Sequence, residues 1–191
     1  MRLVVTGKNG QLSRCIQEVS KNSLISKNLK FIFLGKKKIN IFSLFNILYK
    51  INKHKISIII NCSAFTNVDE AEFKKDEAFR INYFGPLKLS KICKEMNIVL
   101  IHVSTDYVFD GSKKHPYKPN HKTNPLSVYA KSKLAGERAI IASSCKYLII
   151  RTSWLFSNHG NNFLKKIISN ALKEKTLNVV NYEYSNPTYG Y

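Results

Sequence analysis

The stretch "RLVVTGKNGQLS", residues 2–13, joins a short apolar run, a glycine turn and the start of an amphipathic segment. An apolar, β-branched run that ends at a glycine predicts a buried strand. Gly7 and Gly10 follow the run directly and lead into a helix expected at residues 11–20. Glycines at this place permit a tight turn and a close backbone approach to a pyrophosphate, whose charge the helix N-terminus stabilises. The stretch therefore predicts dinucleotide binding, although a simple strand–helix turn also uses glycine.

The rest of the chain repeats this alternation of short apolar runs and helix-like segments. Strands are expected at residues 2–7, 30–35, 56–64, 97–105 and 146–153, with a weaker one at 177–180. Helices are expected at residues 11–20, 43–53, 76–96, 128–144 and 162–173, the third with a kink or break at Gly85-Pro86. Near-continuous apolar runs are typical of parallel strands that are covered on both faces. The pattern predicts an α/β fold: a doubly wound, Rossmann-type, mostly parallel sheet with helices on both faces, forming one NAD(P)-binding domain over residues 1–191.

The composition limits the partners of this domain. The chain has 191 residues and a formal net charge of +19, with 31 Lys and Arg against 12 Asp and Glu. Its lysines are scattered and no aromatic-interleaved basic motif occurs, which favours solvated faces over a nucleic-acid partner. No apolar stretch reaches the length of a membrane span, and the apolar run at the N-terminus is too short for a signal peptide. The four cysteines are far apart, which predicts neither a disulfide framework nor a metal site and fits a cytoplasmic protein.

Ligands of doubly wound sheets bind beyond the carboxyl ends of the strands, so the residues there carry the functional information. After the second strand comes a basic run, Lys36 to Lys38, where an NAD-preferring protein would have a carboxylate. This run either faces a 2′-phosphate or is a solvated loop. The first interpretation slightly favours NADPH over NADH. After the third strand, the small residues Ser63 and Ala64 leave room for a cofactor beside the backbone.

Two further pairs of polar residues follow the third and fourth strands. Asp69 and Glu72 are three apart and share a face of a helix. They can perform acid–base chemistry, but we favour the interpretation that they complement a helix N-terminus. Ser104 and Thr105 place hydroxyl groups where a substrate would lie, although such a pair also serves as a cap or a turn.

Tyr129 and Lys133 form the strongest candidate for catalysis. Residues four apart are neighbours on a helix, so Lys133, and not Lys131, shares a face with Tyr129. An ammonium group ~4 Å from the phenol contributes roughly 1 kcal/mol in water and ~4 kcal/mol at an effective dielectric constant of 20. We therefore expect the pKa of Tyr129 to lie about 1–3 units below its ordinary value of ~10, within reach of general acid–base catalysis.

With these motifs placed, the chain resembles the extended short-chain dehydrogenases/reductases and, more narrowly, the dTDP-4-dehydrorhamnose reductase family. The resemblance rests on the strings "GKNGQL", "TNVDEAE", "STDYVFDG", "VYAKSKLAGE", "RTSWLF" and "NNF", in this order. It implies an NAD(P)H-dependent reductase that converts dTDP-4-dehydrorhamnose to dTDP-L-rhamnose for cell-surface polysaccharide. Thr105 would polarise the C4 carbonyl, Tyr129 would donate the proton, and Lys133 would bind the nicotinamide ribose.

The resemblance also implies the other members of the site. The cofactor-binding positions would be Gly7, Gly10, Gln11, Leu12, Asn40, Ile41, Ala64, Phe65, Thr66, Val103, Tyr129 and Lys133. The substrate-binding positions would be Thr105, Asp106, Tyr129 and Trp154, the last of which is otherwise interpreted as a core or shielding aromatic. Ser13 stands where the last glycine of the turn is expected, and Asn40 where the family has an acidic residue.

Three consequences of the resemblance concern the protein as a whole. About the last third of the sequence of family members, which holds most of their substrate-binding portion, is expected to be absent from this chain. Mg²⁺ is associated with some members, but no residue of this chain can be assigned to it, and a homodimer is left open. The alternatives are a non-catalytic cofactor-binding or regulatory subunit, an inactive remnant of the same fold and, on charge alone, a nucleic-acid-binding module.

Overall fold

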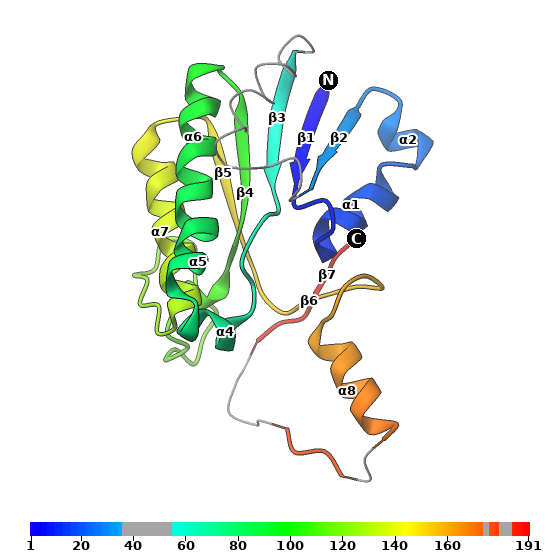
Figure 1. The fold of residues 1–191 in the computed structure, drawn as a ribbon, viewed down its shortest axis with the longest axis vertical. Helices are drawn as coiled ribbons and strands as arrows, with labels where there is room; N and C mark the ends of the chain where they lie inside the picture. The colour runs from blue at the N-terminus through cyan, green and yellow to red at the C-terminus, as the bar shows by residue number, and fades with distance from the viewer. Residues whose placement is uncertain (36–54, 174–175, 180–184) are drawn as a thin grey trace.

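The computed structural model describes residues 1–35, 55–173, 176–179 and 185–191 (Figure 1). Its centre is a five-stranded sheet in the order β2-β1-β3-β4-β5, with every neighbouring pair parallel. The strands are β1 (Arg2–Thr6), β2 (Lys30–Leu34), β3 (Ile56–Asn61), β4 (Val99–Thr105) and β5 (Tyr147–Thr152). All five strands expected from the apolar runs are confirmed, and so is the doubly wound α/β fold.

The α-helices are α1 (Gln11–Val19), α2 (Ser23–Ser26), α4 (Val68–Phe73), α5 (Lys75–Phe79), α6 (Gly85–Glu95), α7 (Val128–Ser143) and α8 (Phe163–Ala171). A π-helical turn, Arg80–Phe84, joins α5 to α6, and a short 3₁₀ turn, Asp106–Val108, follows β4. The helix expected at residues 43–53 lies outside the described residues.

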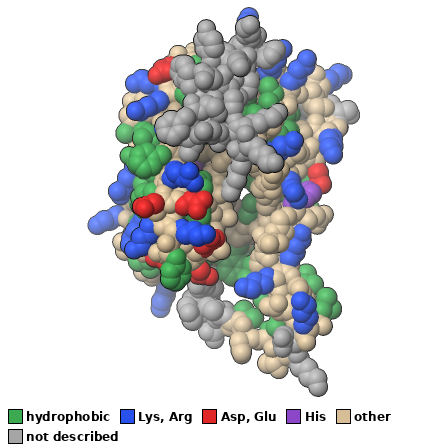
Figure 2. Space-filling model, in the orientation of Figure 1, with side chains coloured by type: hydrophobic (Ala, Val, Ile, Leu, Met, Phe, Trp, Pro, Cys, Tyr) green, Lys and Arg blue, Asp and Glu red, His purple; other side chains and the backbone are tan. Residues whose placement is uncertain are grey.

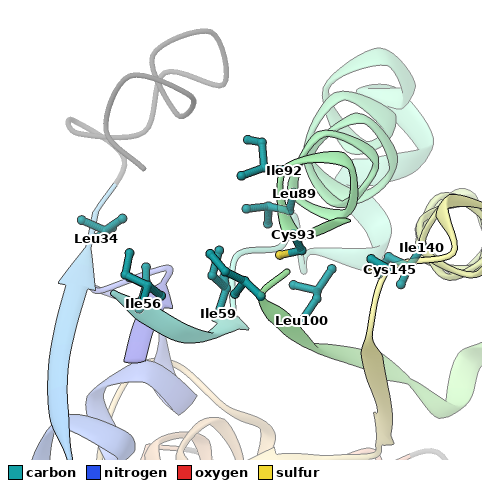
Figure 3. Packing of buried hydrophobic residues seen from close by; sticks show 11 residues of the cluster. Leu34, Ile56, Ile59, Leu89, Ile92, Cys93, Leu100, Ile140 and Cys145 are labelled. Carbon is teal, nitrogen blue, oxygen red and sulfur yellow. The ribbon is translucent and has the colours of Figure 1, made fainter. Parts of the chain in front are cut away.

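One face of the sheet packs against α6 and α7 and forms the main core. Val4, Ile59 and Leu100 project from three adjacent strands and are completely buried. They meet side chains of α6 and α7, including Cys93 and Ile140 (Figure 3). Because these residues come from every part of the first 145 positions, the core fixes the strand order that brings the strand ends together.

The opposite face of the sheet is covered unevenly. Figure 1 places α1 and α2 on the side away from α6 and α7. Next to them, Val5 of β1 is fully buried, whereas Leu148 and Ile150 of β5 on the same face are 52% and 44% exposed. The prediction of helices on both faces is therefore confirmed at β1, while β5 is an edge strand with an open apolar face among the described residues.

The expected interruption at Gly85-Pro86 is confirmed as a change of helical winding. Pro86 has no N–H for the carbonyl of Asn82 one turn earlier, and the π-helical turn absorbs the mismatch without breaking the helix. The carbonyl of Asn82 then faces α7 at Gly136. A Cβ at Gly136 would lie 2.2 Å from that oxygen, so only glycine allows the two helices to approach this closely.

The strand expected at residues 177–180 is wrong for the part that the structure describes. Residues 176–179 belong to no strand, and Val179 is 54% exposed. Instead, β6 (Leu155–Phe156) and β7 (Thr188–Tyr189) form a separate two-stranded parallel sheet. Backbone bonds from Thr188 to Trp154 and from Gly190 to Phe156 extend the pairing by one residue at each end.

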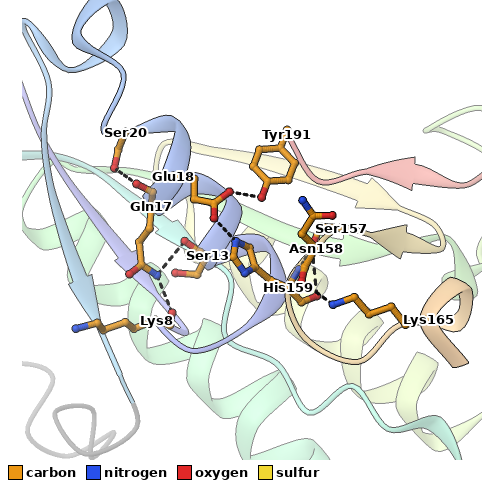
Figure 4. A network of polar contacts seen from close by, with 10 residues as sticks. All are labelled: Lys8, Ser13, Gln17, Glu18, Ser20, Ser157, Asn158, His159, Lys165 and Tyr191. Carbon is orange, nitrogen blue, oxygen red and sulfur yellow. Dashed lines mark hydrogen bonds and ion pairs between the residues drawn. The ribbon is translucent and has the colours of Figure 1, made fainter. Parts of the chain in front are cut away.

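Polar contacts attach this small sheet to α1 (Figure 4). His159 Nε2 lies 2.8 Å from a carboxylate oxygen of Glu18 in α1, and the hydroxyl of Tyr191 donates to the other oxygen. Asn162 donates to the side chain of Gln11 at the start of α1. The chain beyond β5 is thereby held against the helix that follows the glycine turn.

Candidate active site

Polar side chains on three adjacent strands form a continuous hydrogen-bonded row. Thr6 of β1 donates to Asn61 of β3 at 2.6 Å, and the amide of Asn61 lies 3.0 Å from Nδ1 of His102 in β4. Burial, with the charge of Lys133 nearby, holds the pKa of His102 well below its usual value, so the ring is neutral. Sequence reasoning missed this row, although a polar residue inside an apolar strand is a signal for it.

The glycine turn after β1 has the geometry that its sequence predicts. Gly7 has φ +73°, and a Cβ there would lie 2.9 Å from the backbone carbonyl of Cys62. Gly10 precedes α1 and offers no side-chain cap, and no acidic residue occupies the first turn. Gln11 and Leu12 therefore begin a helix whose first N–H groups suit an anion such as a pyrophosphate. Ser13, which replaces the expected glycine, is completely buried.

Asn82 in the π-helical turn fixes the β3–α4 loop, residues 62–67. Its side chain accepts a hydrogen bond from the backbone N–H of Phe65 (2.8 Å) and donates to the carbonyl of the same residue (3.0 Å). It also donates to the hydroxyl of Ser132 in α7 at 2.9 Å. The loop that contains Ala64, Phe65 and Thr66 is thereby fastened to the helix that carries Tyr129. Sequence reasoning did not find Asn82, because its role depends on the winding of the helix around it.

The structure brings Thr105, Tyr129 and Lys133 together. Thr105 ends β4, and Tyr129 and Lys133 lie one turn apart in α7. The hydroxyl of Thr105 lies close enough to that of Tyr129 to act on its pKa. Lys133 is 2% exposed, and its ammonium donates to the carbonyl of Val103 at 2.7 Å. Burial lowers the pKa of Lys133 to about 8, against the opposing effect of Glu137 and Cys62.

The expected lowering of the Tyr129 pKa is wrong. Burial of the phenol raises its pKa to about 12, although the Thr105 hydroxyl acts in the opposite direction. Removing the phenolate from water outweighs the neighbouring ammonium, which is bonded to Val103 instead. A tyrosine with this pKa keeps its proton at neutral pH and is suited to donating it to a basic oxygen.

Glu137, one turn beyond Lys133, joins α7 to β5 through Arg151. The two side chains form an ion pair with a shortest N–O distance of 2.6 Å, and the Glu137 side chain is 1% exposed. Arg151 also donates to the carbonyl of Pro119 and lies over the ring of Phe109. This pair, which sequence reasoning also missed, ties the loop after β4 to α7.

Asp106 and Trp154, the two other residues predicted to bind the substrate, lie just beyond the carboxyl ends of β4 and β5. Asp106 accepts hydrogen bonds from Thr105 and Ser185, and burial raises the pKa of its carboxyl group. Trp154 has φ +38°, a left-handed conformation that costs a bulky residue about 1–3 kcal/mol. Its ring contacts Phe163 edge to face, with centroids 4.8 Å apart, and remains partly exposed. Trp154 is therefore not a core aromatic, whereas its interpretation as a shielding aromatic stays open.

The acidic pair in α4 complements helix N-termini, as we favoured from the sequence. Asp69 lies in the first turn of α4 itself. Glu72 accepts a hydrogen bond from the backbone N–H of Val128, at the start of α7, with a distance of 2.7 Å.

Several expectations concern other parts of the chain. Asn40, Ile41 and the run from Lys36 to Lys38 lie outside the described residues. Over the described ranges, no group of three or more His, Cys, Asp or Glu side chains converges as a metal site, so no ligands for Mg²⁺ can be named. No helix within these ranges is both long and apolar enough to cross a bilayer. Lys and Arg side chains are spread over the visible face (Figure 2).

Comparison with known proteins identifies the family. The model of the family described as the RmlD substrate binding domain matches residues 1–191. The chain belongs to this family. An RmlD relative, the dTDP-4-dehydrorhamnose reductase of Sinorhizobium fredii, is 37% identical over 188 residues, which cover 98% of this chain and 62% of the relative. The chain thus spans less than two thirds of the length of this curated relative.

Solved structures of RmlD proteins have the same fold as this chain. A dTDP-4-dehydrorhamnose reductase from Clostridium acetobutylicum has a TM-score of 0.91 at 37% identity, with 100% of this chain and 66% of the other covered. The enzyme of the same name from Bacillus anthracis, in complex with NADP, has a TM-score of 0.90 at 34% identity. The superposition includes 99% of this chain and 66% of that enzyme.

Proposed function

We propose that the chain supplies the cofactor-binding and proton-donating part of a reductase that acts on the C4 ketone of a dTDP-4-dehydro-6-deoxy sugar. The observation that carries the proposal is the convergence of Thr105, Tyr129 and Lys133 beside the turn at Gly7 and Gly10. The names of the RmlD relatives support the choice of substrate.

NADPH fits the residues at the carboxyl edge of the sheet. The uncapped start of α1 suits the pyrophosphate, and the fixed β3–α4 loop and Val103 would lie along the cofactor. When bound, the nicotinamide supplies the hydride for the ketone. The absence of a carboxylate in the run from Lys36 to Lys38 favours NADPH over NADH, in keeping with the NADP complex of the Bacillus anthracis relative.

The side chains of this chain would perform the proton transfer. Tyr129 holds its proton at neutral pH and would deliver it from its hydroxyl to the carbonyl oxygen as that oxygen gains negative charge. Thr105, whose hydroxyl lies near that of Tyr129, would orient the same oxygen. The buried ammonium of Lys133 would stabilise the resulting phenolate, while Asp106 and Trp154 would hold the sugar nucleotide.

The test is a nicotinamide-oxidation assay with dTDP-4-dehydrorhamnose and NADPH. We expect oxidation that depends on the sugar nucleotide and falls at least about 10²-fold in Tyr129→Phe, because the proton donor is lost. Tyr147→Phe is the matched control, since Tyr147 is an exposed tyrosine of β5. Equal rates for the wild type and Tyr129→Phe would refute the assignment of the proton donor.

The open apolar face at β5 favours a second candidate, a cofactor-binding subunit that works with another polypeptide. Leu148 and Ile150 would then contact that polypeptide or a second copy of this chain. Titration calorimetry that shows NADPH binding, together with no turnover of dTDP-4-dehydrorhamnose, would support this candidate. Sedimentation analysis of Ile150→Lys would show whether the face mediates self-association.

A further inference from the structure

The first turn of α7, which carries Tyr129, is held by two different acceptors. The hydroxyl of Ser127 accepts from the N–H of Ala130 at 3.1 Å, as an ordinary N-cap does. The carboxylate of Glu72 accepts from the N–H of Val128 at 2.7 Å, although Glu72 lies 56 residues earlier in the chain. The first N–H groups of a helix have no partner within the helix, so this second acceptor comes from outside it.

Apolar packing surrounds the bond between Glu72 and Val128. Ala71 and Ala78 are completely buried against Val128, and Phe65 and Tyr129 pack on the same cluster. Because α4 begins directly after the β3–α4 loop, Glu72 connects the segment that would line the cofactor to the helix that would donate the proton. Glu72 itself is exposed on its outer side, so its replacement leaves no buried charge.

We propose that Glu72 is a positioning residue that sets the place of the first turn of α7 and thereby of the Tyr129 hydroxyl relative to Thr105. Its charge also lies at the positive end of the α7 dipole, where a carboxylate is stabilising. Glu72 acts through the backbone and touches no reacting atom. The effect on turnover rests on the proposed reductase function, whereas the effect on α7 does not.

Glu70 is a matched control on the same helix. It is an exposed glutamate two residues earlier, and its side chain pairs with Lys74 and Asn67 rather than with α7. Glu70→Ala therefore removes the same charge from α4 and leaves the acceptor for Val128 in place. Glu72→Gln removes the charge and keeps an acceptor oxygen.

The experiment compares Glu72→Ala, Glu72→Gln and Glu70→Ala in the full chain. Hydrogen exchange at the Val128 amide should be about fivefold faster or more in Glu72→Ala, the equivalent of losing a cap, and close to wild type in the other two variants. With NADPH and dTDP-4-dehydrorhamnose, kcat should fall about 10- to 100-fold in Glu72→Ala with KM changed by no more than about twofold, because a misplaced donor slows the chemical step. Glu72→Gln should recover most of kcat.

Two results would overturn the proposal. The first is exchange at Val128 in Glu72→Ala that equals the wild-type rate. The second is a kcat in Glu70→Ala as low as that in Glu72→Ala, which would indicate a general effect of charge on α4. If the wild type turns over no dTDP-4-dehydrorhamnose, the reductase proposal fails by itself, and the exchange measurement still decides whether Glu72 positions α7.

Discussion

Replacement of Gly136 by alanine should destabilise the protein, although alanine is the better helix former. Within a helix the exchange alone favours alanine by about 1 kcal/mol. The new Cβ would lie 2.2 Å from the carbonyl oxygen of Asn82, about 1 Å inside an ordinary contact, and 3.3 Å from the ring of Pro86. The carbonyl cannot move alone, because the Asn82 side chain is bonded to Phe65 and Ser132.

The displacement must therefore spread through the π-helical turn. Overpacking of this kind costs about 1–3 kcal/mol, and the loss of the Asn82 hydrogen bonds adds about 1 kcal/mol. After subtraction of the gain in helix propensity, we expect a net loss of about 1–3 kcal/mol in the free energy of unfolding. This corresponds to a fall in Tm of roughly 2–12 °C for a chain of this size.

Gly85→Ala is the matched control for this prediction. Gly85 has helical backbone angles, and a Cβ there would meet no atom within 4 Å apart from its chain neighbours. Pro86 follows directly and crowds a preceding Cβ in the helical conformation, which offsets the gain in helix propensity, so Gly85→Ala should change the free energy of unfolding by less than about 1 kcal/mol. Urea unfolding of both variants, with unchanged m-values, measures the difference. Equal stability of Gly136→Ala and Gly85→Ala would refute the argument that the Asn82 carbonyl fixes the distance between the helices.

Three other predictions concern the electrostatics. Arg151→Met leaves the buried carboxylate of Glu137 unpaired and should lower the free energy of unfolding, measured with urea, by about 3–5 kcal/mol. Arg80→Met removes the cation of a pair with mostly exposed side chains and should cost less than about 0.5 kcal/mol. Similar losses in the two variants would contradict the prediction. Hydrogen bonds, foremost from the Ser112 hydroxyl, hold the pKa of Asp110 below its usual value, so its contribution to stability is present at neutral pH and disappears as the pH falls below about 4. Asp110→Asn should flatten the stability profile in that acid range, and an unchanged profile would count against it. Because the pKa of Lys133 is lowered to about 8 in the folded protein, the unfolded chain binds this proton more tightly. The free energy of unfolding should therefore rise as the pH increases from about 8 to 10.5. Lys133→Met should abolish this rise, and a rise that persists in the variant would show that another group causes it.

The sequence was sufficient for the features that depend on local pattern. The five strands of the main sheet follow from apolar runs bounded by polar residues, and the turn at Gly7 follows from its place between strand and helix. The pairing of β6 with β7 could not be predicted, because strands of two residues carry no periodicity. The pairing of these two strands depends on contacts with α1, such as the one between Glu18 and His159.

The sequence predicted that Thr105, Tyr129 and Lys133 lie together, but it did not predict the electrostatics of the site or the residues that position these three. Helix spacing placed Lys133 beside Tyr129, but the pKa of Tyr129 depends on burial by residues distant in the sequence, which no spacing reveals. The role of Asn82 depends on a π-helical turn that brings its side chain to a loop 17 residues earlier. The acceptor role of Glu72 depends in the same way on the packing of α4 against α7.

The left-handed backbone at Trp154 has a consequence for protein engineering. Glycine adopts φ +38° without steric penalty, so Trp154→Gly would relieve local strain and remove the aromatic ring that contacts Phe163. A selection for heat resistance alone would then enrich glycine or asparagine at this position, and under the proposed function the enriched clones would bind the sugar nucleotide less tightly. A library built on this scaffold should hold position 154 constant, or apply selection for ligand binding in every round.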